Sequence, residues 1–323
     1  MIVNMTDGQT ADRAMSSPSN NLGIHGRNPV SEMPLVARNI NKNFGGADPL
    51  SLSLSKARRL LPWGRPVNGG GKNGPVQVLH DISFDIHPGE IFGLIGANGS
   101  GKSTLIRILS TLLLPDGGNV RIFGLDVVAE SGKVRSLINR VSADPSFFRN
   151  MSALENLLFF GRVYGVSPAD IRRKVPEILE RLGFEPERAL EPMSHLSRGQ
   201  QQKIAVARSF LTSPILMLLD EPTTGLDPRS KRDVQAFIRQ VQQEHGATIL
   251  LTTHDMEEAE VLCDRISFIA GGRIVAEGTP LDLRRRVAGG RPVEEITMET
   301  VFMELTGKSI EEDEMPAEVL VSG

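Results

Sequence analysis

The sequence predicts an α/β fold: a core with a mainly parallel sheet, preceded by an antiparallel β subdomain and interrupted by an inserted α-helical subdomain. Two runs, residues 215–220 and 247–254, are nearly all apolar or β-branched, which is typical of buried parallel strands. Apolar residues recur at helical spacing between them, from Val234 to Val241, and indicate a crossover helix. From about 142 to 196 the chain carries only helical signals, which indicates the inserted subdomain.

The remaining elements follow in chain order. Residues 35–44 are strand-like, and a second group of strand patterns leads from 76 into a glycine-rich loop. Ser152 and Glu155 form a capping box that predicts the start of a helix in the inserted subdomain. Near the end, residues 266–278 predict a β-hairpin that turns at two consecutive glycines, 271 and 272.

Three segments are expected to lie outside the main domain, which covers 35–282. Residues 1–34 are polar and rich in Ser, Asn, Gly and Pro, which predicts a disordered N-terminal tail. Residues 46–75 look like an insertion loop, where basic residues stand beside Trp63; the loop either touches a membrane surface or a partner, or is simply solvated. Residues 283–323 are expected to form a C-terminal helix and an acidic tail.

The composition allows a large core and limits the choice of partners. The chain has 323 residues, of which 40% are hydrophobic and 23% charged, enough for one large domain or two. Its formal net charge of -3 argues against binding nucleic acid over the whole surface, so no direct nucleic-acid partner is expected. Cys263 is the only cysteine, so no intrachain disulfide can form. No apolar run approaches the roughly 18 residues of a membrane span, so any membrane role is expected to be peripheral.

A glycine-rich stretch stands between a short apolar run and a helical pattern. It reads G-A-N-G-S-G-K-S over residues 96–103, which fits the spacing of a phosphate-binding loop, or P-loop. Backbone amides of the loop and the start of the helix would cradle nucleotide phosphates. Lys102 would reach the β and γ phosphates, and Ser103 would offer its hydroxyl to a magnesium ion. The alternative is a glycine-rich turn that binds nothing, which the strand before it and the helix after it disfavour. The expected nucleotide contacts in this loop are Gly96, Ala97, Asn98, Gly99, Ser100, Gly101, Lys102, Ser103 and Thr104.

Acidic and histidine side chains end the two buried strands. Asp220 and Glu221 follow the first, at the edge where a parallel sheet normally binds its ligand. Asp220 would hold magnesium directly or through water, and Glu221 would orient and activate the attacking water. His254 ends the second strand and would bond the γ phosphate or position the carboxylate. For all three residues the alternative is a capping role at the helix that follows.

A second anion site is predicted at the start of another helix. Ser197 stands just before apolar residues at helical spacing, so its hydroxyl, the amide of Gly199 and the helix N-terminus can bind an anion together. One chain therefore has two phosphate-binding ends, although it has one P-loop.

In this order the motifs resemble those of the nucleotide-binding subunit of an ABC transporter. The resemblance covers about residues 35–282 and predicts a P-loop NTPase core. The segments that carry it resemble the Walker A motif (96–103), the signature (196–200), Walker B (215–221), the D-loop (224–227) and the H-loop (252–254).

The resemblance implies an ATPase that uses ATP and Mg²⁺ and works as a head-to-tail dimer, either a homodimer or a heterodimer. Residues 96–104 of one subunit and the signature of the other, Ser197, Arg198, Gly199 and Gln200, would enclose each ATP. Asp227 belongs to the segment that resembles the D-loop. Opening and closing would drive a transmembrane permease from the cytoplasmic side of the membrane. The segments around 220–234, 253–266 and 296–307 resemble ATPase subunits of exporters with separate permeases, the kind that moves drugs, antibiotics, sodium or polysaccharides.

Three departures from the family pattern stand out. Ala143, with Asp144 next to it, occupies the place of the glutamine that usually contacts magnesium and the transport partner. This predicts altered coupling geometry with activity retained, although hydrolysis could be slow. Phe44 resembles the aromatic residue that stacks on adenine in this family, although the insertion displaces it. Trp63 is the alternative. Arg198 replaces a glycine that is usual in the signature, a mild change because Ser197 and Gly199 remain.

Two other functions are compatible with parts of the sequence. A soluble ABC ATPase that acts on nucleic acid or ribosomes usually carries two nucleotide modules or a long coiled-coil insert, and this sequence has neither. A regulatory protein that binds ATP without hydrolysing it is favoured by Ala143 and disfavoured by Glu221 and His254.

Overall fold

The computed structural model describes residues 32–45, 76–212 and 214–307. The insertion loop expected at 46–75, with Trp63, lies outside these residues. Nearly all of the expected N-terminal tail and the acidic end of the chain also lie outside them. Within the described ranges, no helix has both the length and the apolar character needed to cross a bilayer.

The strands form two sheets, which we call sheet A and sheet B. Sheet A is antiparallel, has the order β2-β1-β4-β5 and is the predicted antiparallel β subdomain. Its strands are β1 (Leu35–Phe44), β2 (Val76–Ile86), β4 (Gly117–Ile122) and β5 (Leu125–Asp126). Sheet B has the order β10-β9-β3-β8-β7-β6, and every pair in it is parallel except β9 with β10. Its strands are β3 (Ile91–Ile95), β6 (Ile138–Val141), β7 (Leu216–Asp220), β8 (Thr248–Thr253), β9 (Arg265–Ala270) and β10 (Arg273–Gly278).

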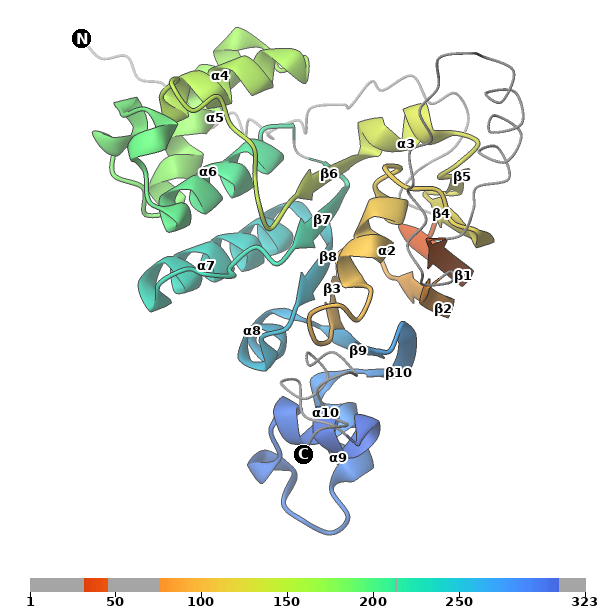
Figure 1. The fold of residues 1–323 in the computed structure, drawn as a ribbon. Coiled ribbons are helices and arrows are strands. Elements are labelled where there is room, and N and C mark those ends of the chain that lie inside the picture. The colour runs from red at the N-terminus through yellow and green to blue at the C-terminus, as the bar shows by residue number, and fades with distance from the viewer. Residues whose placement is uncertain (1–31, 46–75, 213, 308–323) are drawn as a thin grey trace, which may run out of the picture.

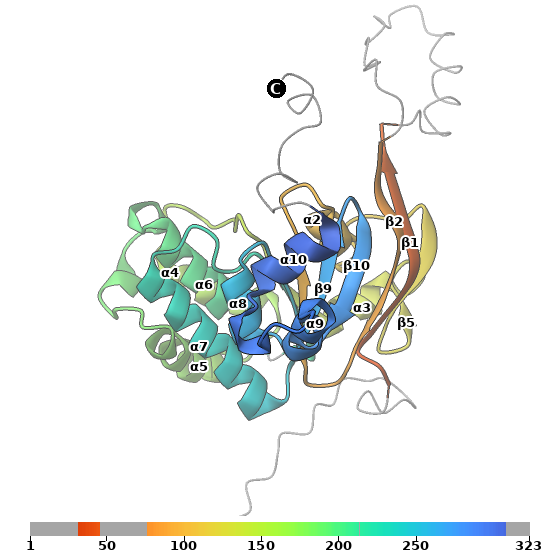
Figure 2. The same cartoon turned by 90° about the horizontal axis from the view of Figure 1, so that it is seen from below.

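The helices cover both faces of sheet B and form a separate group beyond its β6 edge (Figures 1 and 2). They are α2 (Lys102–Leu109), α3 (Ser131–Leu137), α4 (Ala153–Val163), α5 (Pro168–Arg181), α6 (Arg198–Phe210), α7 (Pro228–His245), α8 (Met256–Leu262), α9 (Pro280–Val287) and α10 (Met298–Thr306). The predicted crossover helix is α7, and the predicted capping box of Ser152 and Glu155 starts α4. The helical group consists of α4, α5 and α6, which lie between β6 and β7 in the chain. It therefore continues past the expected end at residue 196.

Sheet B separates two hydrophobic cores. Alternate residues of a strand point to opposite faces, so Phe92 and Leu94 of β3 face a core shared with α2 and sheet A. Ile91 and Ile95 of the same strand face a core shared with α6, α7 and α8. Figure 1 shows α2 on the side of sheet A and α4 to α7 gathered on the other side. Strands β7 and β8 are buried throughout, as predicted for central parallel strands.

A C-terminal helix was expected between residues 283 and 323. Up to residue 307, where the described part of the chain ends, two short helices follow β10, α9 and α10, and the expected boundary at 282 falls inside α9. Gly289 and Gly290 both adopt positive φ angles, 54° and 92°, which ends the first helix and redirects the chain. Helix α10 then packs on sheet B, where the rings of Phe302 and Phe268 meet edge to face with centroids 5.5 Å apart.

The only cysteine of the sequence is part of the core. Cys263 is 4% exposed, and a Cβ built on Gly93 of β3 would lie 2.5 Å from its sulfur. Burial raises the pKa of the thiol well above its ordinary value. Cys263 is therefore a packing residue.

Candidate active site

The glycine-rich loop joins β3 to α2 and lies against the β9–β10 hairpin. A Cβ at Gly96 would lie 2.1 Å from the carbonyl oxygen of Ile269, so this position tolerates no side chain. Gly101 has a φ of 107° and precedes the first residue of α2. The loop therefore keeps its backbone at the N-terminus of the helix, as an anion-binding loop requires.

Lys102 is buried and turned back onto the loop. Its side chain is 4% exposed, and Nζ donates hydrogen bonds to the carbonyl oxygens of Gly96 at 2.6 Å and Ala97 at 2.8 Å. Nζ is also 3.7 Å from Oε1 of Glu221. A buried ammonium group needs such partners, and a phosphate in the loop would supply stronger ones.

The carboxyl ends of three neighbouring parallel strands bring the predicted side chains together. Strands β3, β8 and β7 are adjacent and parallel, so their ends meet at one edge of the sheet. Asp220 ends β7 and is 2% exposed. Its Oδ1 accepts hydrogen bonds from the hydroxyls of Ser103 at 3.2 Å and Thr252 at 2.9 Å. Its Oδ2 accepts one from Arg140 Nη2 at 3.2 Å.

Glu221 is held in a left-handed conformation at the same edge. Its φ is 50°, which costs a non-glycine residue roughly 1 kcal/mol or more, and its N–H donates to the carbonyl of Thr252 at 3.0 Å. Oε2 is 3.4 Å from His254 Nδ1 and accepts a hydrogen bond from Thr224 at 3.1 Å. His254, followed by the positive charge of Lys102, lowers the pKa of Glu221, although partial burial opposes the shift. Glu221 is therefore an anion at neutral pH.

The predicted second anion site lies at the start of α6. Ser197 caps this helix: its hydroxyl accepts from the N–H of Gln200 at 3.2 Å, and its own N–H donates to the Gln200 side chain at 2.9 Å. The turn packs against residues 224–227, because Arg198 atoms lie about 3.5 Å from the Cβ position of Gly225. Asp227 caps α7 by accepting from the N–H groups of Arg229 and Ser230. A hydrogen bond from the Ser230 side chain, followed by these backbone bonds, lowers the pKa of Asp227.

The P-loop at the start of α2 and the signature at the start of α6 do not form one site within the chain. Helix α2 contributes Leu105 and Leu109 to the core on one face of sheet B, while α6 contributes Ile204 and Ala207 to the core on the other. Figures 1 and 2 agree in placing the two helices apart.

Comparison with known proteins decides what this arrangement is. Residues 79–224 match the family model described as ABC transporter. The linearmycin resistance ATP-binding protein LnrL of Bacillus subtilis (strain 168) is 37% identical over 216 residues, which are 67% of this chain and 69% of that protein. The chain belongs to the ABC transporter family of ATP-binding proteins. The predicted recognition and the predicted ATPase class are thereby confirmed, and the nucleic-acid alternative is not favoured.

Two further comparisons agree with this family. A Nod factor export ATP-binding protein I of Cupriavidus pinatubonensis is 40% identical over 210 residues, 65% of this chain and 64% of that protein, so the match spans just under two thirds of that relative. A solved structure titled "Structure of ATP binding subunit of ABC transporter" is 27% identical, with a TM-score of 0.66 over 84% of this chain and 99% of that chain. The predicted α/β fold with its P-loop core is that of ABC ATPases.

The residues at which the sequence departs from the ABC pattern have distinct environments. Ala143 is half-buried and Asp144 exposed, in the segment between β6 and α4. Phe44 ends β1, is 41% exposed, and has the ammonium of Lys42 at 5.6 Å from its ring centroid.

The fold brings three further side chains to this sheet edge that were not predicted from the sequence. Thr252 and Thr224 bond the two carboxylates, and Arg140 pairs with Asp220. Thr252 lies in the H-loop and Thr224 in the D-loop, so membership of these motifs was the sequence signal that could have identified them. For Arg140 the signal was a lone basic residue within the short strand 138–141.

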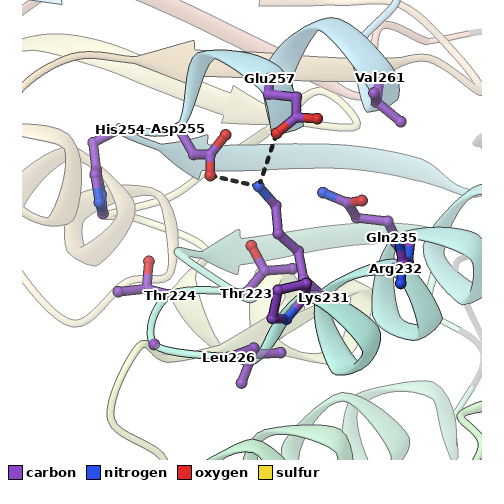
Figure 3. Close-up of a pocket in the computed structure, with 12 residues that line it drawn as sticks. Thr223, Thr224, Leu226, Lys231, Arg232, Gln235, His254, Asp255, Glu257 and Val261 are labelled. Carbon is purple, nitrogen blue, oxygen red and sulfur yellow. Dashed lines mark hydrogen bonds and ion pairs between the residues drawn. The ribbon is translucent and has the colours of Figure 1, made fainter.

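A cavity of about 390 Å³ opens beside the D-loop and His254 (Figure 3). Lys231 of α7 crosses it, with Nζ 2.6 Å from Asp255 and 3.8 Å from Glu257. In the adjoining interior, the Thr223 hydroxyl donates to Glu258 at 2.5 Å. These contacts tie the D-loop helix to the segment that follows the H-loop.

Glu258 gives this ABC domain a built-in pH dependence of stability. It is 1% exposed, and burial raises its pKa above the ordinary value of 4.5. Because the pKa of Glu258 is higher in the folded state, its protonated form favours folding. The stability that Glu258 contributes is fully present below about pH 4.5 and is lost as the pH rises through the folded-state pKa. We therefore expect Glu258→Gln to have a higher urea midpoint than the wild type at pH 8. The difference should shrink towards pH 4.5.

The control for this experiment is Glu257→Gln. The neighbouring Glu257 side chain is 87% exposed, so its replacement should leave the pH dependence unchanged. Parallel stability curves for the wild type and Glu258→Gln would contradict the assignment.

Proposed function

We propose that this chain powers export of a substrate through a separate membrane permease, by closing two ATPase subunits around ATP and reopening them after hydrolysis. The observation that carries the proposal is the meeting of Lys102, Asp220, Glu221 and His254 at one sheet edge, with Ser197 presented on a different surface. Export is supported by the names of the relatives, which include resistance and Nod factor export proteins.

The residues at the sheet edge fit ATP with Mg²⁺. The loop amides and the α2 N-terminus suit phosphate oxygens, and the hydroxyl of Ser103 and the carboxylate of Asp220 are oxygen ligands, which Mg²⁺ prefers. In the described part of the chain, no three or more His, Cys, Asp or Glu side chains are grouped to hold a metal ion. When bound, the ion neutralises charge on the phosphates.

The chain's own side chains then have separate tasks. Lys102 exchanges the carbonyls of Gly96 and Ala97 for phosphate oxygens. Glu221, kept ionised, orients the attacking water and accepts its proton, and His254 holds the Glu221 carboxylate in place. Thr104 and the remaining loop residues, 97–101, contact the phosphates, and Phe44 stacks on the adenine.

The signature completes the site in a second ATPase subunit. The residues from Ser197 to Gln200 present a serine hydroxyl and helix amides, and α6 lies on the other face of sheet B from the P-loop helix. Two subunits arranged head to tail satisfy both ends at once, in a homodimer or a heterodimer. Arg198 packs on Gly225, so the signature is in direct contact with the D-loop that contains Asp227.

An aromatic surface on the helical group supports docking of the permease. We call it the aromatic surface; its members are Phe148, Phe159, Phe160, Val163 and Tyr164. Phe148 and Phe159 are 47% and 41% exposed, with ring centroids 4.9 Å apart. Exposed apolar clusters mark contact surfaces. This surface lies on α4 and the segment before it, where Ala143 and Asp144 would alter the coupling, and the chain would sit peripherally on the cytoplasmic side of the membrane.

Purification of the full chain from membranes of its own host tests this function. We expect tagged wild-type protein to co-purify with a membrane protein of about six spans, each of roughly 20 apolar residues. Phe159→Asp should lose that protein, because a charge on the aromatic surface must be desolvated at the contact. Met303→Asp is the control, since Met303 is 48% exposed but lies on α10. Retention of the membrane protein by Phe159→Asp would rule out the aromatic surface, and its absence from the wild type would rule out the transport role.

A further inference from the structure

A basic side chain reaches the proposed metal site from the edge of sheet B. Arg140 lies on β6, opposite Leu218 of β7. Its Nη2 is 3.2 Å from Asp220 Oδ2 and 3.4 Å from the hydroxyl of Ser142. The side chains of the pair are 22% and 3% exposed, so this ion pair is much less hydrated than a surface one.

The two oxygens of Asp220 have different partners. Oδ1 accepts from two neutral hydroxyls, those of Ser103 and Thr252, whereas Oδ2 faces the guanidinium of Arg140. The neighbouring Glu221 has its own cation in Lys102. Each carboxylate at the sheet edge is thus paired with a cation of the chain itself.

The guanidinium of Arg140 carries a delocalised positive charge. A divalent cation bound by Ser103 and Asp220 would therefore meet a fixed positive charge on the same carboxylate. Arg140 also stands three residues before Ala143, which occupies the place of a neutral metal-contacting glutamine in the family pattern.

We propose that Arg140 is an internal counter-ion of Asp220 that competes with Mg²⁺ and so sets the metal concentration that the site requires. The inference rests on the proposed role of Asp220 and Ser103 as metal ligands. Without metal, Arg140 neutralises the buried carboxylate and holds it in position. With metal and nucleotide, the guanidinium must give up or share Oδ2, which weakens metal binding.

Direct metal binding to the nucleotide-loaded full chain tests this inference. The probe is Mn²⁺, titrated into protein saturated with ADP and followed by electron paramagnetic resonance, so that the readout does not depend on hydrolysis. Free Mn²⁺–ADP is subtracted with a protein-free titration. We expect Arg140→Gln to bind Mn²⁺ about 10-fold more tightly than the wild type, since a nearby positive charge is removed. Arg140→Lys, which keeps the charge, should stay within about 3-fold of the wild type.

Two controls separate this effect from a general loss of charge or structure. Arg181→Gln removes an arginine that pairs with Glu244 at 2.7 Å between α5 and α7, and it should leave Mn²⁺ affinity unchanged. Arg140→Met keeps the aliphatic stem and replaces Arg140→Gln if the latter does not fold. In metal-free buffer with EDTA, the neutral variants should melt at a lower temperature than the wild type, because Asp220 loses its counter-ion.

The outcomes are distinguishable. Tighter Mn²⁺ binding by the neutral variants alone supports the inference. Equal or weaker binding by these variants, with one Mn²⁺ bound per wild-type site, overturns it and leaves the metal role of Asp220 intact. Absence of nucleotide-dependent Mn²⁺ binding in the wild type overturns that metal role itself, and the inference with it.

Discussion

Glu221→Gln is expected to lower the rate of ATP hydrolysis at least about 100-fold, the scale on which a positioned general base acts. His254 and Lys102 lower the pKa of Glu221, so the wild-type side chain is a carboxylate that can accept a proton. A glutamine of the same shape cannot accept one. Phosphate release at saturating ATP and Mg²⁺ measures the change, and Glu257→Gln, on the exposed side of α8, is the control. An unchanged rate would remove Glu221 from the mechanism.

The same variant should trap the closed dimer. With hydrolysis blocked, ATP remains bound between the subunits, so light scattering should report a monomer without nucleotide and a stable dimer with ATP and Mg²⁺. Adding Ser197→Phe should abolish this dimer. Ser167→Phe is matched to it, since Ser167 caps α5 by accepting from the N–H of Asp170 at 3.1 Å. Each substitution loses a cap worth about 1 kcal/mol, so a dimer lost only with Ser197→Phe identifies the signature as its other half.

Lys102→Ala is expected to weaken ATP binding by at least about 100-fold, because charge-assisted hydrogen bonds to phosphate contribute several kcal/mol. Fluorescence titration of the full chain with a labelled ATP analogue measures the affinity. The variant also frees the carbonyls of Gly96 and Ala97, so a thermal melt must accompany the titration.

Lys203→Ala is the matched control for this change. Lys203 is equally buried, but its ammonium pairs with Asp233 between α6 and α7, at 2.8 Å. We expect this variant to lose stability and keep its nucleotide affinity. Retained binding by a folded Lys102→Ala protein would contradict the loop assignment.

The parts of the site that the sequence predicted are those encoded by local spacing. Residues 96–103 carry their geometry in three closely spaced glycines, at 96, 99 and 101, and the strands that end at Asp220 and Thr253 have a composition that marks them as central. Neighbouring parallel strands end at the same sheet edge. Asp220, Glu221 and His254 therefore lie near the P-loop once the strands that carry them are neighbours of the strand before the loop. The hairpin at Gly271 and Gly272 was equally local, and both glycines have positive φ.

The parts that escaped prediction depend on contacts between distant segments. Arg140 reaches Asp220 because β6 pairs with β7 in a particular register, and a strand of four residues gives too short a pattern to reveal which way its side chains point. The packing of Arg198 on Gly225 joins two motifs that the sequence treats separately. The chain breaks between α9 and α10 at Gly289 and Gly290, which have positive φ angles. The direction it then takes depends on the packing of α10 on Phe268, a contact between distant segments.

The burial of Cys263 has a practical consequence for studying this protein in motion. Thiol-directed dyes and spin labels need an accessible thiolate, and the native sulfur is enclosed behind β3 with its pKa raised. Reporter groups can therefore be attached at introduced surface cysteines without first deleting the natural one. One label on the helical group and one on sheet A would make the ATP-driven rearrangement visible as a change in distance, on an otherwise unaltered chain.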